Sequence, residues 1–324
     1  MNYIKMAPLG GFTGYGGGPP NLSMYSIGTP AYQGSGDWYG PRAIFAGGYV
    51  DNDSNKNTID YVAINSTSNA TDFGDITSAS QTNAAGGGST NMAVIPHFTG
   101  GTIDVINNVN NTGNSTSFGD MTQARGSFAA SSSGTRALFS GGWASNTHQD
   151  TIDFIHFDTA NSSWDFADLS VARHGSGGCG SDTRALVFGG VASGSANDTI
   201  DYTTYATLSD ATDFGDMDNA AYGCSGCSDN SWALMASGYE TGYVTKWRYV
   251  VIDTASNAIN YGDLIGSNWY YAVSTSDGDR GIFAGGRGGA MNANINYRDI
   301  STTGNAQDAG DLTQARQSCG STSG

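Results

Sequence analysis

The chain has 324 residues, a formal net charge of −16 and 48 glycines. Glu240 is its only glutamate, and Lys5, Lys56 and Lys246 are its only lysines, so residues that favour exposed helices are nearly absent while turn-forming glycine, asparagine and aspartate are abundant. The composition therefore predicts an all-β fold, and the negative charge argues against nucleic acid or anionic lipid as a direct partner.

No apolar run reaches the length of about 18 residues that a membrane span requires, so no membrane insertion is expected. The N-terminal sequence MNYIKMAPLGG lacks the apolar stretch of a signal peptide, so export directed by a signal peptide through the Sec pathway is not expected either.

Residues 1–41 are rich in glycine and proline, carry scattered aromatic side chains and show no strand periodicity. Such a segment cannot bury a core of its own. We predict an extended docking arm that contacts the surface of a neighbouring subunit, with Phe12, Tyr15, Met24 and Tyr25 as its candidate contact residues. The alternative is a disordered tail.

From Arg42 onwards the sequence repeats. The apolar stretch RALFSGG, which begins at Arg136, has near-copies that begin at Arg42, Asn91, Arg184, Trp232 and Arg280. The six starts are 49, 45, 48, 48 and 48 residues apart. A period of this length indicates one structural unit used six times.

Each unit contains the same predicted strands in the same order. The apolar strand ends in Gly-Gly, and after a variable loop an Ile-Asp-aromatic strand follows, such as Ile152-Asp153-Phe154. Next come a short strand that ends in aromatic-Gly-Asp, such as Phe118-Gly119-Asp120, and a strand of small residues, such as Gly126–Gly134. Their alternation is that of half-buried strands. Four strands in about 48 residues have the size of a propeller blade, so residues 42–324 are predicted to form a six-bladed β-propeller.

The apolar strand ending in Gly-Gly, with an aromatic residue at a fixed later spacing, resembles kelch-type repeats over roughly residues 42–324. The wording T-R-A-x-F-x-G-G, T-I-D-Y, A-T-D-F-G-D and Q-A-R is similar to kelch-like arrays in structural proteins of marine bacteriophages. The resemblance implies a virion component, such as a tail fibre, appendage or decoration protein, assembled in the host cytoplasm and found in the virion or outside the cell. The pattern departs from the family at Gly100-Gly101, which runs directly into Thr102, and at Ser237-Gly238.

The C-terminal segment ends where another apolar strand would begin. It matches the small-residue strand of the repeat, with Arg316 at the position of Arg125 and Arg173. We predict that this strand completes blade one and closes the ring, because closure removes open sheet edges. In the alternative register, residues 31–36 (AYQGSG) supply the inner strand of blade one instead.

The four cysteines do not suggest a disulfide framework. Cys179, Cys227 and Cys319 are expected at one small-residue position, which other units fill with Gly86, Ser131 or Thr275. Buried free thiols fit such a position. Cys224-x-x-Cys227 lacks the additional ligands of a metal site, and no cofactor is predicted.

Every unit carries an aspartate after aromatic-Gly or its equivalent; these are Asp75, Asp120, Asp168, Asp216, Asp263 and Asp311. Because each copy belongs to its own blade, an architectural role is expected. Their carboxylates are predicted to accept turn N–H groups and to pair with Arg125, Arg173 and Arg316.

Binding is expected where the repeats differ. The loops after Gly-Gly share one face of a propeller with the loops after the Phe-Gly-Asp element, and they carry aromatic side chains among aspartates and asparagines. Our candidate binding residues are Tyr49, Trp143, His148, Tyr239 and Tyr243. Aromatic rings beside amides and carboxylates suit a host receptor, a glycan or another subunit. The alternative is that these are solvated variable loops.

Asp51, Asp53 and Asn55 place oxygen donors at alternate positions, as a calcium loop does. The glycine and the distal glutamate of an EF-hand are missing, so we predict no metal and keep this segment as the one calcium candidate.

Features of an enzyme are absent from the sequence. The histidines occupy unrelated repeat positions, and no Ser-His-Asp order, nucleophile elbow or phosphate-binding glycine motif is present. We predict a non-enzymatic protein. Two alternatives remain open, namely a polysaccharide-active enzyme with a carboxylate pair on the loop face and an intracellular kelch-type adaptor for protein–protein interaction.

Overall fold

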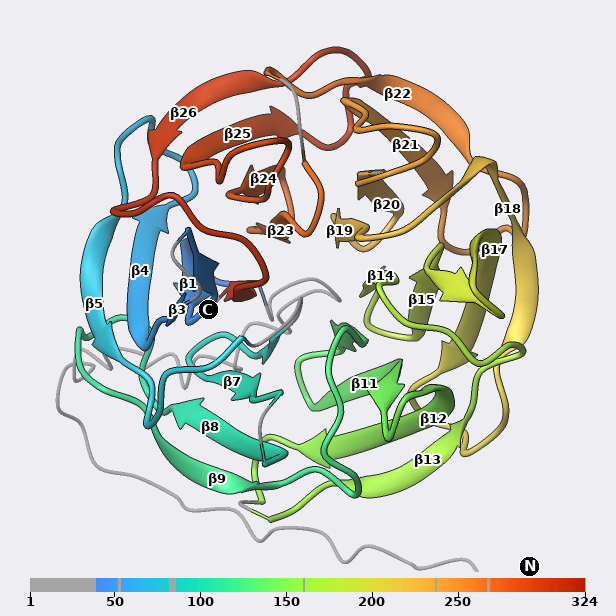
Figure 1. The fold of residues 1–324 in the computed structure, drawn as a ribbon, viewed down its shortest axis with the longest axis horizontal. Coiled ribbons are helices and arrows are strands. Elements are labelled where there is room, and N and C mark those ends of the chain that lie inside the picture. The colour runs from blue at the N-terminus through green and yellow to red at the C-terminus, as the bar shows by residue number, and fades with distance from the viewer. Residues whose placement is uncertain are drawn as a thin grey trace, which may run out of the picture. The chain divides into compact units, whose positions relative to one another are not determined.

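The computed structural model describes residues 39–51, 54–81, 86–98, 100–159, 161–236, 238–266 and 269–323. Within these ranges the chain forms strands joined by turns and contains no helix. The arm residues Phe12, Tyr15, Met24 and Tyr25 lie outside the described residues. The fold of the described part is the predicted six-bladed β-propeller, with its sheets arranged around a central axis (Figure 1).

The first three blades are four-stranded antiparallel sheets. From the axis outward, blade one contains β27 (Gly320–Ser323), β1 (Arg42–Ala46), β4 (Thr58–Ala63) and β5 (Thr71–Asp75). Blade two contains β6 (Gly87–Gly88), β7 (Ala93–Pro96), β8 (Thr102–Ile106) and β9 (Thr116–Asp120). Blade three contains β10 (Ala129–Ser132), β11 (Arg136–Ala144), β12 (Thr147–His156) and β13 (Trp164–Asp168).

The other three blades follow the same order. Blade four contains β14 (Gly177–Gly180), β15 (Arg184–Phe188), β17 (Ser195–Thr204) and β18 (Thr212–Ala221), with β16 (Val191–Ala192) paired to β17. Blade five contains β19 (Ser225–Ser228), β20 (Trp232–Ala236), β21 (Lys246–Val251) and β22 (Ile259–Asp263). Blade six contains β23 (Val273–Ser276), β24 (Arg280–Ala284), β25 (Asn294–Asp299) and β26 (Gln307–Asp311).

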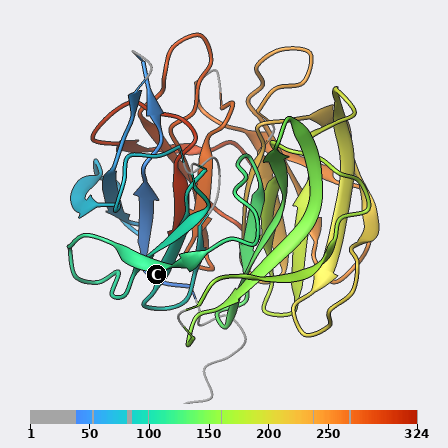
Figure 2. The ribbon, with the colours of Figure 1, turned by 60° about the horizontal axis from the view of Figure 1, so that its bottom comes forward.

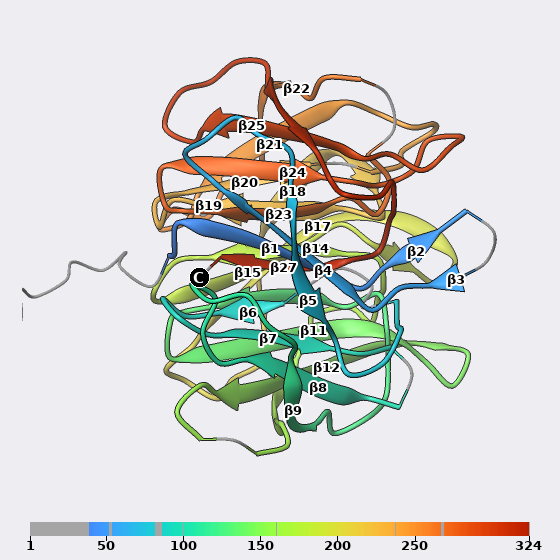
Figure 3. The ribbon, with the colours of Figure 1, turned by 90° about the vertical axis from the view of Figure 1, so that its left-hand side faces the viewer.

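The strands run between two faces of the ring, and the loops that join them lie on those faces (Figure 2). We call the side that carries the loops after Gly-Gly the loop face, and the side that carries the Thr-Arg turns the turn face. On the loop face of blade one, β2 (Tyr49–Val50) and β3 (Ser54–Asn55) form a separate hairpin that projects from the ring (Figure 3).

The ring is closed by the C-terminal strand, as predicted. β27 pairs antiparallel with β1, with Thr322 opposite Ile44 and Gly320 opposite Ala46. In Figure 1 this places the red end of the chain beside the blue β1. Blade one therefore combines the first and last strands of the propeller, and β1 has no free edge.

Apolar residues pack between neighbouring blades. The described residues form six buried clusters, each of which joins two adjacent sheets. One cluster brings Phe45 and Val62 of blade one against Ile282 and Ile295 of blade six. The hydrophobic core is thus divided among the blade interfaces, and the interface that closes the ring resembles the other five.

The second glycine of the Gly-Gly pair allows the chain to leave the apolar strand close to the segment that enters the inner strand. Gly142 and Gly190 have φ angles of 115° and 103°. A Cβ atom at Gly142 would lie 2.8 Å from the carbonyl oxygen of Gly126, and one at Gly190 would lie 2.8 Å from that of His174. Glycine is needed at this position because the φ angle is positive and because the neighbouring backbone leaves no space for a Cβ atom. The next residue is thereby brought beside the inner-strand segment.

The arginine of the Thr-Arg turn links each blade that has it to the next. Its guanidinium lies over an aromatic ring of its own blade and donates a hydrogen bond to a carbonyl of the following blade. Arg184, for example, lies 5.0 Å from the ring centre of Tyr202 and donates to the Ile252 carbonyl at 2.9 Å. Arg280 of blade six does the same across the closure, over Tyr297 and to Ile64 of blade one.

The buried carboxylate of a blade belongs to the Ile-Asp-aromatic strand and not to the aromatic-Gly-Asp element. Among the described residues, three arginine–aspartate pairs are fully buried: Asp60–Arg316 (3.0 Å), Asp153–Arg125 (3.1 Å) and Asp201–Arg173 (3.1 Å). Each carboxylate also accepts hydrogen bonds from a threonine or serine on the same incoming segment, as Asp153 does from the N–H and hydroxyl of Thr122. Arg125, Arg173 and Arg316 thus pair with aspartates of the Ile-Asp-aromatic strands, and their predicted pairing with the aspartates after aromatic-Gly was wrong.

The aspartates after aromatic-Gly lie on the outermost strands of the blades. Five of the six are exposed, and Asp75 is half-buried. The backbone N–H group of such an aspartate donates a hydrogen bond to the next blade. The N–H of Asp75, for example, donates to Asn114 Oδ1 at 3.0 Å. A Cβ atom on the preceding Gly74 would lie 2.4 Å from the Gly113 carbonyl, so the glycine permits this approach. The motif is an inter-blade contact made by the backbone.

All four cysteines are buried free thiols. Cys179 and Cys227 lie opposite Leu186 and Leu234 in the inner strands. The corresponding residue of blade one is Thr322, because Cys319 precedes β27 in the way that Cys224 precedes β19. The expected equivalence of Cys319 with Cys179 was therefore wrong, as was that of Gly86, whose neighbour Gly87 occupies the position.

Candidate functional site

Six residues form a ring on the loop face, each beside a segment that enters an inner strand. Five of them follow the Gly-Gly pair or its Ser-Gly equivalent, and the sixth, Phe98, precedes Gly100-Gly101 of blade two but makes the matching backbone hydrogen bond. We call these residues and their partners the rim. The pairs are Tyr49–Gln317, Phe98–Gln81, Trp143–Gly126, Val191–His174, Tyr239–Tyr222 and Arg287–Tyr270. Side chains directly opposite in an antiparallel pair stand on the same side, with Cβ atoms about 5 Å apart. The rim therefore gathers non-repeated side chains from all six blades.

Trp143, His148 and His174 form one cluster on the rim. The Trp143 ring lies 4.9 Å from each imidazole, measured between ring centres, and the two imidazoles stack at 5.0 Å. Their Nδ1 atoms are 3.0 Å apart, so one ring donates its N–H to the other. Burial, and secondarily the neighbouring His148, lowers the pKa of His174. The site is therefore an aromatic surface with two coupled imidazoles.

Four tyrosines of blades five and six form a second cluster. The Tyr222 ring lies 5.3 Å from Tyr239 and 5.4 Å from Tyr270, and Tyr243 lies 5.3 Å from Tyr239 and 6.2 Å from Tyr270. Most of these contacts are tilted or edge-to-face, a preferred geometry for aromatic pairs. Tyr243 is 44% exposed while the other three are half-buried. We call these four residues the tyrosine cluster.

The structure brings the candidate residues together in two pairs, Trp143 with His148 and Tyr239 with Tyr243. Tyr49 lies in the rim on blade one, where it exchanges backbone hydrogen bonds with Gln317. Phe98 of blade two is 38% exposed and covers Gly126, since a Cβ atom there would lie 1.8 Å from its ring.

Sequence reasoning missed His174, Tyr222, Tyr270 and Arg287, which belong to the same surface. Three of these four lie on segments that enter the inner strands, and in the sequence these segments look like part of the repeated framework. Aligning the residue after Gly-Gly with its partner in the register of the repeat would have found them, because the pairing recurs from blade to blade.

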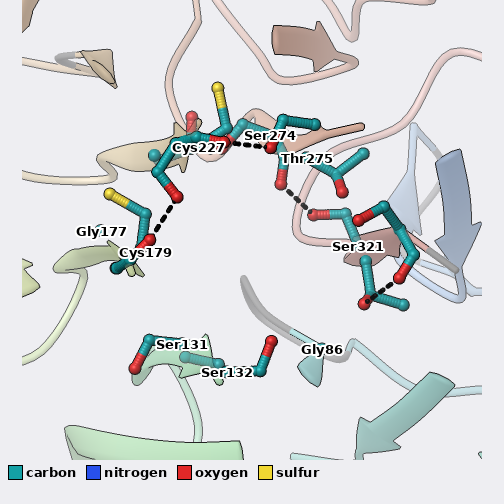
Figure 4. Close-up of a pocket in the computed structure, with 18 of the residues that line it drawn as sticks. Gly86, Ser131, Ser132, Gly177, Cys179, Cys227, Ser274, Thr275 and Ser321 are labelled. Atoms are coloured by element: carbon teal, nitrogen blue, oxygen red, sulfur yellow. Dashed lines mark hydrogen bonds between the residues drawn. The ribbon is translucent and has the colours of Figure 1, made fainter. Parts of the chain in front are cut away.

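The central channel is narrow and lined by small side chains from the inner strands. Glycine, serine, threonine and cysteine surround a cavity of about 60 Å³ (Figure 4). Ser276 donates to the Ser228 carbonyl, and Ser228 donates to the Gly180 carbonyl, so hydroxyls link successive inner strands. Tyr39, which was predicted as part of the arm, packs its ring against Gly278 and its hydroxyl lies 2.9 Å from that of Ser228. The cavity has room for only a few water molecules.

A wider groove of about 590 Å³ lies between blades three and four on the turn face. Its arginine, Arg136, already lies over Phe154 and donates to the Tyr205 carbonyl. The groove is therefore built largely from framework residues of the repeat, unlike the rim.

Aspartate pairs also occur at the edge of blades three and four. Burial, followed by the charges of Asp150 and Asp210, raises the pKa of Asp168, while burial and the charge of Asp198 raise the pKa of Asp216. Both carboxylates are exposed, and the same pair recurs in consecutive blades. Repetition favours an architectural origin over a catalytic pair.

The calcium candidate is only partly described. Asp51 and Asn55 are exposed, and Asp53 lies outside the described residues. Across the described ranges, histidine, cysteine and acidic side chains nowhere form a group of three or more that could hold a metal ion.

No protein-family model matches the chain. A comparison with curated proteins likewise finds no significant match. Among the described residues no helix is long and apolar enough to cross a membrane. The fold and the rim therefore carry the functional argument, and a β-propeller with a varied face is compatible with binding to other molecules.

Proposed function

We propose that this protein is a non-enzymatic binding protein whose rim recognises a glycan or a receptor on a surface. The observation that carries the proposal is the segregation of its side chains. The repeated arginines and buried aspartates hold blades together, whereas the aromatic and imidazole side chains of blades three to six that do not repeat gather on the loop face. Aromatic rings with polar edges are enriched at recognition surfaces.

We further propose that the protein is a phage virion component, in a tail fibre, appendage or decoration, that presents the rim outward. Residues 1–41 would anchor it to other subunits. Support for this setting comes from the resemblance of the repeat wording to kelch-like arrays of marine phages. Mass spectrometry of purified virions would test the setting, and cross-linking would test the anchor. Detection in virions with cross-links from residues 1–41 is expected, and an intracellular protein absent from virions would contradict it.

The binding role is tested by applying the labelled full-length protein to an array of bacterial surface polysaccharides. We expect binding to fall at least about tenfold for Tyr239→Ala combined with Tyr243→Ala, because aromatic contacts at the centre of an interface dominate its affinity. Trp164→Ala is the matched control, since Trp164 is also 41% exposed but lies on β13 at the outer edge of blade three. Equal loss in the control would contradict the role of the rim.

The same array samples separate binding from catalysis. Incubation of the bound polysaccharides with the protein is expected to release no reducing ends. Release of reducing ends that is lost on substitution of Asp168 by asparagine would contradict the non-enzymatic proposal and support a sugar-active enzyme.

A further inference from the structure

The arginines of this chain are nearly all part of its framework. The 13 basic residues are three lysines and ten arginines, and all ten arginines lie in the described part of the chain. Nine of them donate side-chain hydrogen bonds to protein oxygens or form ion pairs; these are Arg42, Arg125, Arg136, Arg173, Arg184, Arg248, Arg280, Arg298 and Arg316. Their positive charges are therefore committed to the fold.

Arg287 is the exception. It follows the Gly-Gly pair of blade six, where its backbone N–H donates to the Tyr270 carbonyl at 2.9 Å. Its guanidinium makes no hydrogen bond or ion pair with any described residue. The side chain is half-buried, so it stands partly out of water, and the described residues use none of its five N–H donors.

The position of Arg287 connects it to the tyrosine cluster. Arg287 lies directly opposite Tyr270, so the two side chains stand on the same side of the pair. Tyr270 in turn contacts Tyr222, Tyr239 and Tyr243. A planar group with a fork of donors thus adjoins a set of aromatic rings with phenol edges.

The acidic residue that follows Tyr239 does not neutralise this arginine. Glu240 bonds Arg248 at 2.7 Å, and Arg248, which is fully buried in place of the usual aspartate of blade five, also pairs with Asp218. Glu240 is therefore already used by Arg248, and no described carboxylate pairs with Arg287. Guanidinium groups bind carboxylates through two parallel hydrogen bonds, so the Arg287 guanidinium can bind a carboxylate of a ligand.

We propose that Arg287 and the tyrosine cluster form a subsite for an acidic sugar, a pyranose unit that carries one carboxylate. The guanidinium binds the carboxylate, and the ring of the exposed Tyr243 lies against the apolar face of the sugar. The inference rests on the proposed glycan-binding role of the rim.

The net charge of the protein restricts the ligand further. A charge of −16 repels dense polyanions at long range, and this argues against nucleic acid and polyphosphate. Screening limits that repulsion to about 8 Å at physiological salt, so a single carboxylate that reaches the guanidinium escapes most of it. The tyrosines distinguish a sugar from an acidic peptide, because the flat apolar face of a pyranose matches an aromatic ring.

The test is calorimetric titration of the full-length protein with oligomers of glucuronic acid, galacturonic acid and sialic acid, each paired with its carboxyl-reduced form. We expect at least one acidic form to bind about tenfold or more tightly than its reduced form, the magnitude of charged hydrogen bonds. Arg287→Gln should abolish this preference while leaving binding of the reduced form unchanged. Arg298→Gln is the control, since Arg298 bonds carbonyls of its own turn, and it should keep the preference.

The outcomes separate this inference from the function on which it rests. If the preference is missing in the wild type, or persists in Arg287→Gln, the acidic-sugar subsite is wrong. If Tyr243→Ala still weakens binding of the reduced sugars in that case, the rim retains its proposed role. If neither substitution affects any binding, the rim itself is wrong. Binding of an acidic oligopeptide, and of none of the sugars, in a manner that requires Arg287 would overturn the sugar assignment.

Discussion

At the scale of residues, the buried aspartates in the blade centres are each held by several partners. Asp60 accepts hydrogen bonds from the N–H and hydroxyl of Thr313 in addition to its pair with Arg316. Thr313 and Arg316 lie on the segment that enters the inner strand β27, and Asp60 lies on β4 of the same blade. A charge in this position is stable only while its partner remains, because desolvation of an unpaired ion is costly.

We expect Arg316→Met to lower the free energy of unfolding by about 3–5 kcal/mol, because it leaves Asp60 buried without its guanidinium. Guanidinium chloride unfolding followed by tryptophan fluorescence measures the loss. Arg298→Met serves as the control, because its guanidinium donates to the carbonyls of Thr302 and Thr303 and pairs with no described carboxylate, and a change within about 0.5 kcal/mol is expected. An equally small change for Arg316→Met would contradict the assigned role of the ion pair.

Asp104 of blade two predicts a pH dependence of stability. Burial acts to raise its pKa, but hydrogen bonds from His97, Ser115 and Thr77 outweigh burial and hold the pKa below its usual value. A carboxyl group whose pKa is lower in the folded state stabilises the fold above the unfolded value of about 3.9, and loses this effect as the pH falls through the folded value. The wild type should therefore exceed Asp104→Asn in stability near neutral pH, and the difference should shrink below about pH 4. A difference that stays constant with pH would refute the assignment.

At the scale of elements, the Gly-Gly pair connects the framework to the rim. The apolar strand before it packs in the blade interface, and the residue after it stands on the rim. The framework can therefore repeat while the rim residue changes from tyrosine to tryptophan, valine or arginine. β27 has a different role, since it joins the end of the chain to its first blade.

Removal of the segment from Leu312 onwards should open the ring, because β1 then loses its inner partner and Asp60 loses Arg316. We expect a lower melting temperature and early proteolysis in blade one. Addition of a synthetic peptide covering Leu312–Ser323 should restore the melting temperature, since the peptide supplies the missing strand. A truncated protein that melts like the full chain, with or without the peptide, would show that β27 does not close the ring.

At the scale of the whole molecule, the ring was predictable from the sequence because the number and length of the repeats give the number and size of the blades. Six copies of an apolar strand ending in Gly-Gly predicted six blades, and the incomplete first and last units predicted closure by the C-terminal strand. These features depend on order along the chain, which a sequence displays directly.

The partners within each blade were less predictable, because they depend on register. Arg316 is close in sequence to Asp311 but pairs with Asp60, more than 250 residues away. Cys319 was assigned to the wrong position, although the spacing of Cys179 from Arg173 leads to Thr322 when it is counted from Arg316. The rim was found only in part, because its second half lies on segments that look like framework in the sequence.

The claim that the rim is the binding surface is tested most directly by hydrogen–deuterium exchange of the full-length protein, with and without the polysaccharide that it binds most tightly on the array. We predict that protection is concentrated in residues 143–150, 239–246 and 287–294, which carry Trp143, the tyrosine cluster's exposed member Tyr243, and Arg287. Protection concentrated instead in the Thr-Arg turns of the opposite face, with these three segments unchanged, would contradict the account.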